Sequence, residues 1–377
     1  MNLSSTSQFV PQVTPDVAIF LRSLYGGGAE RAMLNLAHSM IDQGLKVDLL
    51  LARVEGQYLS HVRPEVRIVD LKARQVAKSL FTLMSYLKQV QPRTLLVTLH
   101  YPCEIALLAK QLTGVPTRII ISEQNTLSVE AKLTPKLSAR LSPLAARFFY
   151  PWADGITAVS KGVADDLARV TRLQRERIQI IYNPVVSDQM LLQAQEPVEH
   201  PWFAPGNPPV ILAVGRLYLQ KDYPTLLRAF AKVRQVKSVR LMILGDGPER
   251  ENLTKLTQEL DIAEDVALPG FAQNPHAYMT KAAVFVLSSA WEGLPTVLIE
   301  ALAVGTPVVS TNCESGPSEI LAQGKYGHLT PVGDSQAIAQ AILQVLNSGG
   351  QKVDPHWLEQ YTPEVCAQKY VNIMGIS

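Results

Sequence analysis

The sequence is poor in cysteine and has no long apolar run. Three of its 377 residues are cysteines, namely Cys103, Cys313 and Cys366, and this odd, sparse count excludes a disulfide framework and is typical of a reducing cytoplasm. No apolar stretch reaches the roughly 18 residues that a membrane-spanning helix needs. Residues 1–12 lack the charged-then-apolar pattern of a secretory signal, so we expect a frayed start there. The expected location is therefore the cytoplasm.

Signatures of a metal site are also missing. No Asp-x-Asp motif occurs, and no group of His and Cys residues has the spacing of zinc ligands. We therefore expect no metal cofactor. Cationic side chains and helix amides would then have to stabilise any negative charge that develops in a reaction.

The net charge is only +2, which excludes a protein-wide basic field for nucleic acid. The charge is nevertheless unevenly divided. Residues 1–190 carry 22 Lys/Arg against 15 Asp/Glu (+7), and residues 191–377 carry 13 against 18 (−5). A basic first half suits an anionic partner, such as a phosphate-bearing acceptor or an acidic membrane surface. One candidate face is a basic, leucine-rich helix expected over 132–147, for which a solvated surface helix is the alternative.

Short runs of Val, Ile and Leu alternate with amphipathic segments along the chain. Strands are expected at 17–21, 47–51, 94–99, 118–121, 155–159 and 178–181, and again at 210–214, 239–244, 266–268, 284–287 and 308–310. Residues 185–209 contain five prolines and are typical of a linker. Uninterrupted apolar strands separated by helices predict parallel sheets covered on both faces. The expected fold class is α/β, with two doubly wound, Rossmann-like domains facing an interdomain cleft.

Two basic residues follow the first strand of the second domain. Arg216 lies directly after Gly215, and Lys221 follows five residues later. Arginine offers a bidentate fork and lysine a point charge, so together they suit a diphosphate, although a solvated basic turn is the alternative. The glycine loops 26–31 and 245–250 follow other strands, but neither has the spacing of a dinucleotide fingerprint. An NAD-dependent dehydrogenase is therefore disfavoured.

The segment from Ser288 to Ala303 is the most informative. Glu292 follows a predicted strand, and Pro295 suits the first turn of a helix expected over 296–304. Glu300 lies inside this apolar helix, where a carboxylate is costly unless it is paired or used. A helix N-terminus favours a diphosphate, and carboxylates accept hydrogen bonds from hydroxyls, which together fit a nucleotide sugar. The alternative is a surface glutamate and a structural ion pair.

Polar motifs also follow strands of the first domain. His100 ends one strand and is as well suited to a phosphate or sugar oxygen as to a structural role. Residues 122–125, Ser-Glu-Gln-Asn, end the next strand and are equally well placed to form hydrogen bonds. Ser160-Lys161 and Asn183-Pro184 end two more, where caps and turns are the alternative.

These residues together resemble those of a family 4 glycosyltransferase, a family with the GT-B fold, over nearly the whole chain. The specific part is the Glu292-x7-Glu300 segment combined with Arg216 and Lys221. The resemblance also includes the segments 26–31, 122–125, 159–160, 183–184, 245–248, 270–271, 305–308 and 315–320, together with His100.

The resemblance implies a hexosyltransferase that moves a sugar from a nucleotide donor with retention of anomeric configuration and without a metal or other cofactor. Arg216 and Lys221 would bind the donor diphosphate, Glu292 the hydroxyls of the donor sugar, and Glu300 the ribose. His100 would lie near the donor sugar. Arg216, Lys221, Glu292 and His100 are thus the candidate catalytic residues.

Further donor contacts follow from the same resemblance. Backbone amides at Gly293, Leu294 and Pro295 would face the diphosphate and sugar. Gly27 and Gly28 would approach the donor phosphate from the other domain, and Phe271 would lie near the base. Asn125 is a candidate on the acceptor side.

The resemblance also divides the chain. Residues 1–195 would form an acceptor-side domain, residues 196–360 a nucleotide-sugar-binding domain, and residues 361–377 a helix that crosses back to the first domain. A two-step reaction would need a carboxylate nucleophile, and no residue is identified as one. The resemblance favours same-face attack, in which the departing phosphate helps to deprotonate the acceptor.

The expected donor is a UDP-sugar, and the expected acceptor is a glycan or lipid-linked glycan of surface-polysaccharide or glycoconjugate biosynthesis. Peripheral contact with an anionic membrane is left open, and no nucleic-acid partner is expected. Two alternatives stay open. One is a GT-B relative that acts on the donor without a glycan acceptor, as an epimerase or a phosphorylase does. The other is a non-catalytic scaffold that binds nucleotide sugars or glycans.

Overall fold

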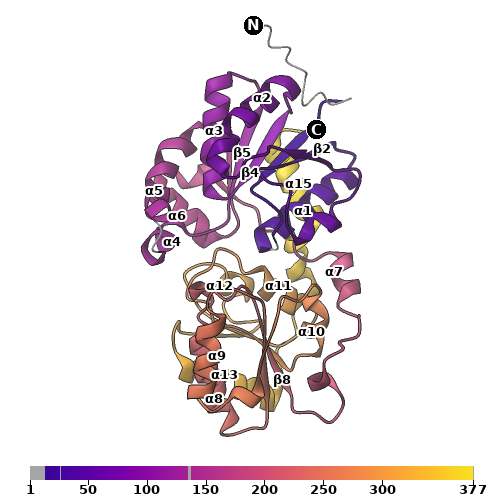
Figure 1. The fold of residues 1–377 in the computed structure, drawn as a ribbon, viewed down its shortest axis with the longest axis vertical. Helices are drawn as coiled ribbons and strands as arrows, with labels where there is room; N and C mark the ends of the chain where they lie inside the picture. The colour runs from indigo at the N-terminus through magenta and orange to yellow at the C-terminus, as the bar shows by residue number, and fades with distance from the viewer. Residues whose placement is uncertain (1–12, 26, 135–136, 377) are drawn as a thin grey trace. The chain divides into compact units, whose positions relative to one another are not determined.

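A computed structural model describes residues 13–25, 27–134 and 137–376, so the start expected over 1–12 lies outside the described residues. The chain forms two compact units. The first comprises Met1–Pro184 and Pro363–Ser377, and the second comprises Val185–Thr362. Figure 1 shows the elements of both units along the chain.

The first unit contains a seven-stranded sheet in the order β3-β2-β1-β4-β5-β6-β7, with parallel pairing throughout. Its strands are short and rich in Val, Ile and Leu, as buried parallel strands require. They are β1 (Val17–Leu21), β2 (Val47–Leu51), β3 (Arg67–Asp70), β4 (Thr94–Thr98), β5 (Arg118–Glu123), β6 (Gly155–Ala158) and β7 (Ile178–Ile180).

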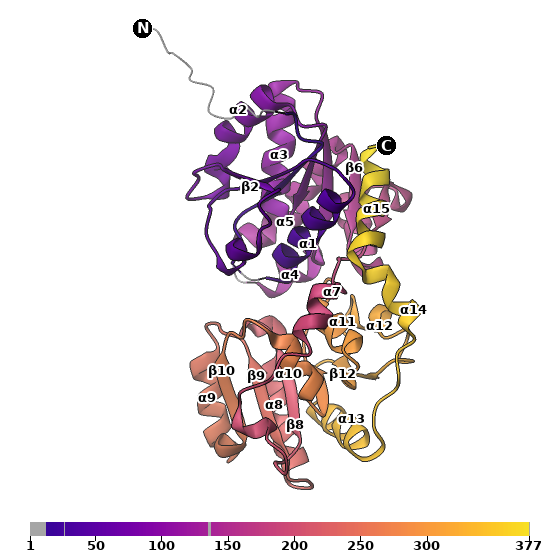
Figure 2. The ribbon, with the colours of Figure 1, turned by 90° about the vertical axis from the view of Figure 1, so that its right-hand side faces the viewer.

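Helices cover both faces of this sheet. They are α1 (Gly28–Asp42), α2 (Leu80–Val90), α3 (His100–Thr113), α4 (Leu127–Leu133), α5 (Leu137–Phe149), α6 (Lys161–Thr171) and α15 (Pro363–Met374). In Figure 1, α2 and α3 lie on one side of the strands and α1 and α15 on the other. Helix α1 buries Met33, Leu36 and Met40, whose spacing places them on one helical face. The C-terminal helix α15 runs beside α1 (Figure 2) and adds Tyr370 and Met374 to the same core.

The prediction of a single helix over 132–147 is wrong, because the helical conformation is interrupted between α4 and α5. Thr134 ends α4 in an extended conformation, with φ −98° and ψ 129°. The next residue in the sequence is a proline, and a residue before proline avoids the helical region because of the proline ring. The basic, leucine-rich pattern therefore falls on two helices, and most of it lies on α5.

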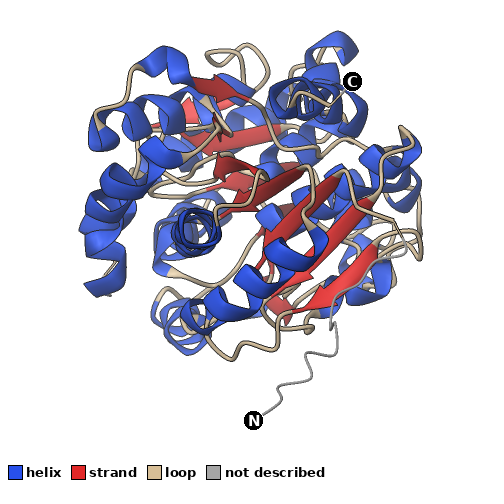
Figure 3. Ribbon diagram, turned by 90° about the horizontal axis from the view of Figure 1, so that it is seen from above, coloured by secondary structure: helices blue, strands red, loops and turns tan. Residues whose placement is uncertain are grey.

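The second unit contains a six-stranded parallel sheet in the order β10-β9-β8-β11-β12-β13. The strands are β8 (Val210–Val214), β9 (Arg240–Leu244), β10 (Val266–Gly270), β11 (Val284–Leu287), β12 (Val308–Thr311) and β13 (His328–Thr330). The helices are α7 (Asp188–Gln193), α8 (Tyr223–Arg234), α9 (Arg250–Glu259), α10 (Pro275–Lys281), α11 (Thr296–Ala303), α12 (Pro317–Ile320), α13 (Ser335–Ser348) and α14 (Pro355–Leu358). Figure 3 shows strands with helices on both sides, which confirms the expected α/β class of two doubly wound parallel sheets.

The boundary between the units lies earlier than the expected position after residue 195. Helix α7 belongs to the second unit because carbonyl groups at its C-terminal end accept hydrogen bonds from α10 and from the N-cap residue of α10. The Asn274 Nδ2 donates to Gln193 O at 2.7 Å, and the Thr280 hydroxyl donates to Ala194 O at 3.1 Å. The proline-rich segment that follows therefore lies inside this unit.

Candidate active site

The second sheet changes its direction of growth between β8 and β11. From β8 the chain adds β9 and β10 on one side, and it then returns to add β11, β12 and β13 on the other. At such a switch point the loops beyond the strand ends diverge and leave room for a ligand. Arg216 and Lys221 follow β8, and Glu292 follows β11. The two strands that flank the switch point thus carry the three residues singled out in the sequence.

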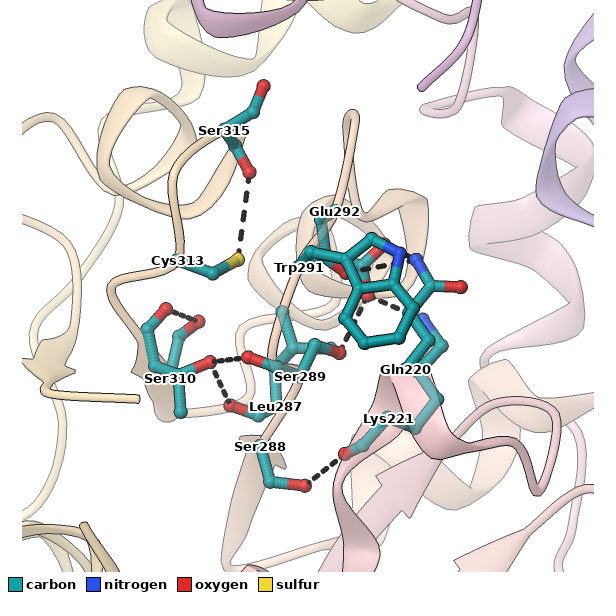
Figure 4. Close-up of polar contacts among 11 residues, drawn as sticks. Gln220, Lys221, Leu287, Ser288, Ser289, Trp291, Glu292, Ser310, Cys313 and Ser315 are labelled. Atoms are coloured by element: carbon teal, nitrogen blue, oxygen red, sulfur yellow. Dashed lines mark hydrogen bonds and ion pairs between the residues drawn. The ribbon is translucent and has the colours of Figure 1, made fainter. Parts of the chain in front are cut away.

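Lys221 and Glu292 meet at this point. The Lys221 Nζ lies 2.6 Å from Glu292 Oε1, and the two side chains are 15% and 8% exposed (Figure 4). The Ser289 hydroxyl donates to the same carboxylate oxygen at 2.6 Å. The Gln220 amide approaches Glu292 Oε2 at 3.4 Å. Lysine, hydroxyl and amide donors therefore hold the carboxylate in one orientation.

Hydrogen bonds to backbone carbonyls fix the loop after β8 to the loop after β11. The Ser288 hydroxyl donates to Lys221 O at 2.7 Å, and Ala290 N donates to Gln220 O at 2.8 Å. Gln220 Nε2 also donates to Trp291 O at 2.9 Å. These bonds keep the lysine and the glutamate within reach of each other without a ligand, which is the preorganisation that charge stabilisation needs.

Arg216 belongs to the same loop as Lys221 but is exposed. Its guanidinium carbon lies 5.1 Å from the centre of the Tyr218 ring, a cation–π distance. The ring therefore covers one face of the planar guanidinium. A guanidinium held in this way suits bidentate binding of a phosphate.

Two glycines let neighbouring backbones approach this region closely. Gly245, at φ +143°, follows β9, and a Cβ there would lie 2.0 Å from Gly215 O. Gly316, at φ +94°, follows β12, and a Cβ there would lie 2.5 Å from a side-chain atom of Pro295. Neither position accommodates a larger side chain. At Gly245, this close packing explains why the 245–250 motif begins with glycine.

Glu300 lies on the buried face of α11. Its Oε2 lies 3.4 Å from Nε2 of His276 on α10, and both side chains are nearly inaccessible. The expectation that this carboxylate is paired or used is therefore met by a specific partner, which the sequence analysis did not identify.

The loop before α11 holds three more of the expected residues. Gly293, Leu294 and Pro295 are buried, and the Ser315 hydroxyl donates to Gly293 O at 2.9 Å. Pro295 is the N-cap residue of α11 rather than part of its first turn. Since proline has no N–H, the prediction that a backbone amide at Pro295 faces the diphosphate is wrong. Phe271 follows β10, an edge strand of the second sheet, and is 42% exposed.

The first sheet has its own switch point, between β1 and β4. Gly27 follows β1 as the N-cap of α1, and Gly28 is the first residue of that helix. A Cβ on Gly27 would lie 2.1 Å from the Glu30 carboxylate, so this side chain lies against the helix start. His100 is the first residue of α3, and its side chain lies outside the described residues. Leu99 before it has φ +69°, a strained value for a branched residue that costs about 1–3 kcal/mol.

Most of the 122–125 motif has a structural role. Ser122, Glu123 and Gln124 are buried and bonded internally. Glu123 Oε2 accepts from the Tyr150 hydroxyl at 2.8 Å, and Gln124 Nε2 donates to Ser122 Oγ at 3.0 Å. Asn125 is half-buried, so of the four it is the one whose side chain is partly exposed, and its role on the acceptor side stays a prediction.

The other two motifs of the first unit are also structural. The Ser160 Oγ accepts from Val163 N at 3.2 Å and caps α6. The Asn183 amide donates to Gln124 Oε1 at 2.9 Å. The cap interpretation therefore holds for Ser160, whereas Asn183 lies in no turn and ties its segment to the 122–125 motif.

Three partners of Glu292 and Glu300 were not predicted from the sequence, namely Gln220, Ser289 and His276. Gln220 and Ser289 adjoin Lys221 and Glu292 in sequence, so their proximity was a usable signal. His276 lies 24 positions before Glu300 and has no motif around it. Only the packing of α10 against α11 brings it there.

Burial and the glutamate charge affect nearby acidic groups. Burial, with a contribution from Glu292, raises the pKa of the Cys313 thiol to about 12. Burial and the same carboxylate raise the pKa of the Tyr223 hydroxyl well above its ordinary value. Both groups therefore stay protonated at neutral pH and add no negative charge to the site.

Within the described ranges, no group of three or more His, Cys, Asp or Glu side chains is placed to hold a metal ion. Over the same part of the chain, no helix combines the length and the apolar character that crossing a bilayer requires.

Two family models match the chain. The model described as Glycosyltransferase Family 4 matches residues 26–189, and the model described as Glycosyl transferases group 1 matches residues 195–360. Together they span both compact units.

Curated relatives are similar over most of their length. A Campylobacter jejuni protein, N-acetylgalactosamine-N,N'-diacetylbacillosaminyl-diphospho-undecaprenol 4-alpha-N-acetylgalactosaminyltransferase, is 30% identical over 341 residues, which are 88% of this chain and 90% of that protein. The lipopolysaccharide core biosynthesis glycosyltransferase LpsE of Rhizobium meliloti is 26% identical and matches 85% of this chain and 86% of its own.

Solved structures share the fold at lower identity. The lipopolysaccharide outer core galactosyltransferase WaaB, in its apo form, has a TM-score of 0.70 at 21% identity and covers 95% of this chain and 99% of its own. Anabaena HepE, in complex with UDP and glucose, has a TM-score of 0.76 at 18% identity. The match covers 96% of this chain and 100% of HepE.

Proposed function

Because this chain belongs to glycosyltransferase family 4 and has the GT-B fold, we propose that it transfers a sugar from a UDP-linked donor to a lipid-linked glycan. In this proposal the anomeric configuration is retained and neither a metal ion nor another cofactor is needed. The observation that carries the proposal is the Lys221–Glu292 pair beside Arg216 at the switch point of the second sheet.

The reaction has a simple balance of atoms and electrons. The bond between the anomeric carbon and the leaving phosphate oxygen breaks, and its electron pair stays on the diphosphate. The acceptor oxygen forms a bond to the same carbon on the same face, and its proton passes to the departing phosphate. Negative charge therefore builds up on the diphosphate, where cationic donors are most effective.

Arg216 and Lys221 supply this stabilisation. The guanidinium of Arg216 binds two phosphate oxygens at once, whereas Lys221 contributes a localised charge. Glu292 holds Lys221 in place before the donor arrives and accepts hydrogen bonds from hydroxyls of the donor sugar. Glu300, supported by His276, accepts hydrogen bonds from the ribose.

The remaining site residues have positioning roles in this proposal. The amides of Gly293 and Leu294 face the diphosphate, and Phe271 packs against the base. The roles expected for Gly27, Gly28 and His100 toward the donor, and for Asn125 toward the acceptor, stay predictions.

Support for the substrates comes from the relatives. HepE was solved with UDP, and the Campylobacter jejuni relative acts on an undecaprenol-linked diphosphate by its name. A lipid-linked acceptor also fits the excess of positive charge in the first half of the sequence. The protein would then work in the cytoplasm, at the membrane surface that holds its acceptor.

The first experiment mixes the purified protein with a panel of nucleotide sugars, with and without a bacterial lipid extract. Release of UDP that requires the extract and survives EDTA is expected, and NMR of the product should show the anomeric configuration of the donor. An inverted product would contradict retention, and loss of turnover in EDTA would contradict metal independence. Conversion of the donor without extract would indicate an epimerase, and phosphate-dependent release would indicate a phosphorylase. Binding without release in extract that supports a known transferase would indicate a scaffold.

A matched pair of arginine variants tests the site itself. Arg216→Ala should lower kcat/KM by about 10²-fold or more, by analogy with other groups that stabilise developing charge. Arg240 also stacks on an aromatic ring, Trp202, at 5.0 Å, but it lies at the beginning of β9, away from the carboxyl ends of the strands. Arg240→Ala should therefore leave turnover unchanged. Equal effects of the two variants would contradict the assigned site.

A further inference from the structure

The two oxygens of the Glu292 carboxylate have unequal surroundings. Oε1 lies 2.6 Å from the Lys221 ammonium and accepts from the Ser289 hydroxyl at 2.6 Å. Among the described residues, Oε2 has one hydrogen-bond donor near it, the Gln220 amide at 3.4 Å. A carboxylate oxygen has two lone pairs, so Oε2 keeps room for a further donor. Oε2 is therefore the oxygen to which a hydroxyl of the donor sugar can bind.

The Gln220 carboxamide is held in one orientation. Its nitrogen faces two acceptors, the Trp291 carbonyl oxygen at 2.9 Å and Glu292 Oε2 at 3.4 Å. The reverse orientation would place the amide oxygen against both of these oxygens, so the nitrogen belongs there. The amide oxygen Oε1 is directed away from both (Figure 4), and no residue that the structure describes donates to it. Because Gln220 is only half-buried, this oxygen is an acceptor available to a ligand.

Glu292 Oε2 and Gln220 Oε1 form a pair of neighbouring acceptors. The Gln220 nitrogen contacts the first oxygen and shares one carboxamide with the second. Substituents on adjacent carbons of a sugar ring present two hydrogen-bond donors side by side. A sugar hydroxyl bound to Glu292 therefore brings the substituent on the next ring carbon to Gln220.

Lys221 indicates which ring carbon this is. It follows Gln220 in the chain, and both side chains contact the Glu292 carboxylate. In the proposed function Lys221 binds the donor diphosphate, which is attached to carbon 1 of the sugar. Among the groups attached to the other ring carbons, the one on carbon 2 is closest to that diphosphate. The carbon 2 substituent thus falls at Gln220, and the carbon 3 hydroxyl falls at Glu292.

An aromatic residue adjoins the acceptor at Gln220. Trp291 lies directly before Glu292, and its carbonyl is the one that the Gln220 amide binds. Trp291 is half-buried, so part of it is open to a ligand. Tryptophan offers a large apolar surface and one N–H donor. An acetamido group has the matching features, namely an N–H for the glutamine oxygen, a carbonyl oxygen for the indole N–H and a methyl group for the ring. A hydroxyl would leave the ring without an apolar partner.

We propose that Gln220 and Trp291 select a UDP-linked 2-acetamido-2-deoxyhexose as the donor. Gln220 Oε1 accepts from the amide N–H of the sugar, and the indole of Trp291 packs against the acetamido methyl group. Both residues act on the choice of donor and not on the bond that reacts. This inference rests on the proposed function, since it assigns a class of sugar to the donor site proposed there.

Two matched pairs of donors test the inference with the full-length protein. UDP-N-acetylglucosamine and UDP-glucose differ only in the carbon 2 substituent, and so do UDP-N-acetylgalactosamine and UDP-galactose. Titration calorimetry measures the affinity of each donor, with UDP alone as the reference. In at least one pair the acetamido donor should bind about 10- to 100-fold more tightly than its partner, because a small apolar group in a shaped pocket has an effect of this order.

Trp291→Leu and Gln220→Met separate donor selection from support of the site. Each should weaken binding of the acetamido donor about tenfold more than binding of the hexose donor. A residue that acted only through Glu292 would weaken both donors equally and leave their ratio unchanged. Trp291→Leu should bind UDP as the unaltered protein does, which also establishes that its site is folded. Trp202→Leu is the matched control, because Trp202 lies beside Arg240 at the beginning of β9, and it should change no affinity.

Three outcomes would overturn the inference. One is equal or tighter binding of the hexose donor in both pairs, and another is a preference that either variant retains in full. A third is loss of UDP binding in Trp291→Leu, which would assign Trp291 to the nucleotide. Transfer from a UDP-hexose to the lipid extract would leave the proposed function standing in each case. Failure of the unaltered protein to bind UDP or any of the four donors would instead contradict the proposed function and the inference together.

Discussion

Lys221 Nζ lies 2.6 Å from Glu292 Oε1, although 71 positions separate the two residues in the chain. Neither side chain is more than about a sixth exposed, so each charge depends on the other. Removing one partner of such a pair leaves a charge with little solvation, which costs more than the loss of a surface ion pair.

This relationship predicts different effects on activity and stability. Lys221→Ala should lower kcat/KM by about 10²-fold or more and should also lower the free energy of unfolding, by up to about 3 kcal/mol. Adding Glu292→Gln to Lys221→Ala removes the uncompensated charge. The double variant should therefore recover stability but not activity. Measurements of kcat/KM and of denaturant unfolding check this, and a double variant as unstable as the single one would contradict it.

His276 is predicted to position Glu300. His276→Ala should raise the KM for the donor about tenfold with little change in kcat, since the carboxylate that we propose to bind the ribose loses its neighbour at 3.4 Å and no group proposed at the reacting carbon is removed. His276→Gln keeps an N–H donor in place and should recover most of the affinity. Steady-state kinetics separate the two constants. A fall in kcat alone, or no difference between the alanine and glutamine variants, would argue against a positioning role.

Two glycines with positive φ provide a test of close packing. Gly245→Ala should destabilise the second unit by about 2 kcal/mol more than Gly305→Ala, because overpacking adds to the cost of the backbone conformation. The added Cβ would lie 2.0 Å from Gly215 O in the first case, whereas Gly305, at φ +80°, has no neighbouring atom within 4 Å. Denaturant unfolding of both variants measures the difference. Equal losses would mean that the approach of Gly245 to Gly215 is not required.

The buried hydroxyl of Tyr370 predicts a loss of stability at high pH. Burial raises its pKa to about 12, above the ordinary value of about 10 for an unfolded chain. Below pH 10 the hydroxyl is protonated in both states, and its contribution is complete. As pH rises from 10 to 12 the unfolded state loses the proton first, so the free energy of unfolding should fall by about 1.4 kcal/mol per pH unit.

Tyr370→Phe checks this assignment. The variant should be less stable at pH 8, because the hydroxyl of Ser122 loses its partner at 2.8 Å. Its stability should also fall less steeply above pH 10. Denaturant titrations at a series of pH values measure both effects, and an unchanged slope would assign the alkaline loss to other groups.

The alternation of apolar runs and amphipathic segments was enough to predict the α/β class and most strands. It missed β3 and β13, whose sequences are Arg-Ile-Val-Asp and His-Leu-Thr. Both are edge strands with one neighbour each, so polar side chains are tolerated there and the apolar pattern is weak. It also joined α4 to α5, because the leucine spacing continues across a proline that ends the first helix.

Candidate site residues were predictable where a motif combined charge with a strand end. Arg216, Lys221 and Glu292 were identified in this way. The motif at 122–125 looked equally suitable, but three of its residues are bonded within the fold. Polar residues at a strand end look alike in sequence whether they bind a ligand or a neighbouring tyrosine, because the difference lies in what packs against them.

The sequence by itself determined the local properties of this protein: most of its strands and helices, its glycine turns and its family. Local backbone preference and the spacing of apolar residues depend on near neighbours in the chain, so they can be read from it. Only the tertiary structure decided which distant groups meet, as Lys221 meets Glu292 and His276 meets Glu300. It also decided that the leucines of α5 face outward, because burial depends on which elements pack together and not on the sequence of one helix.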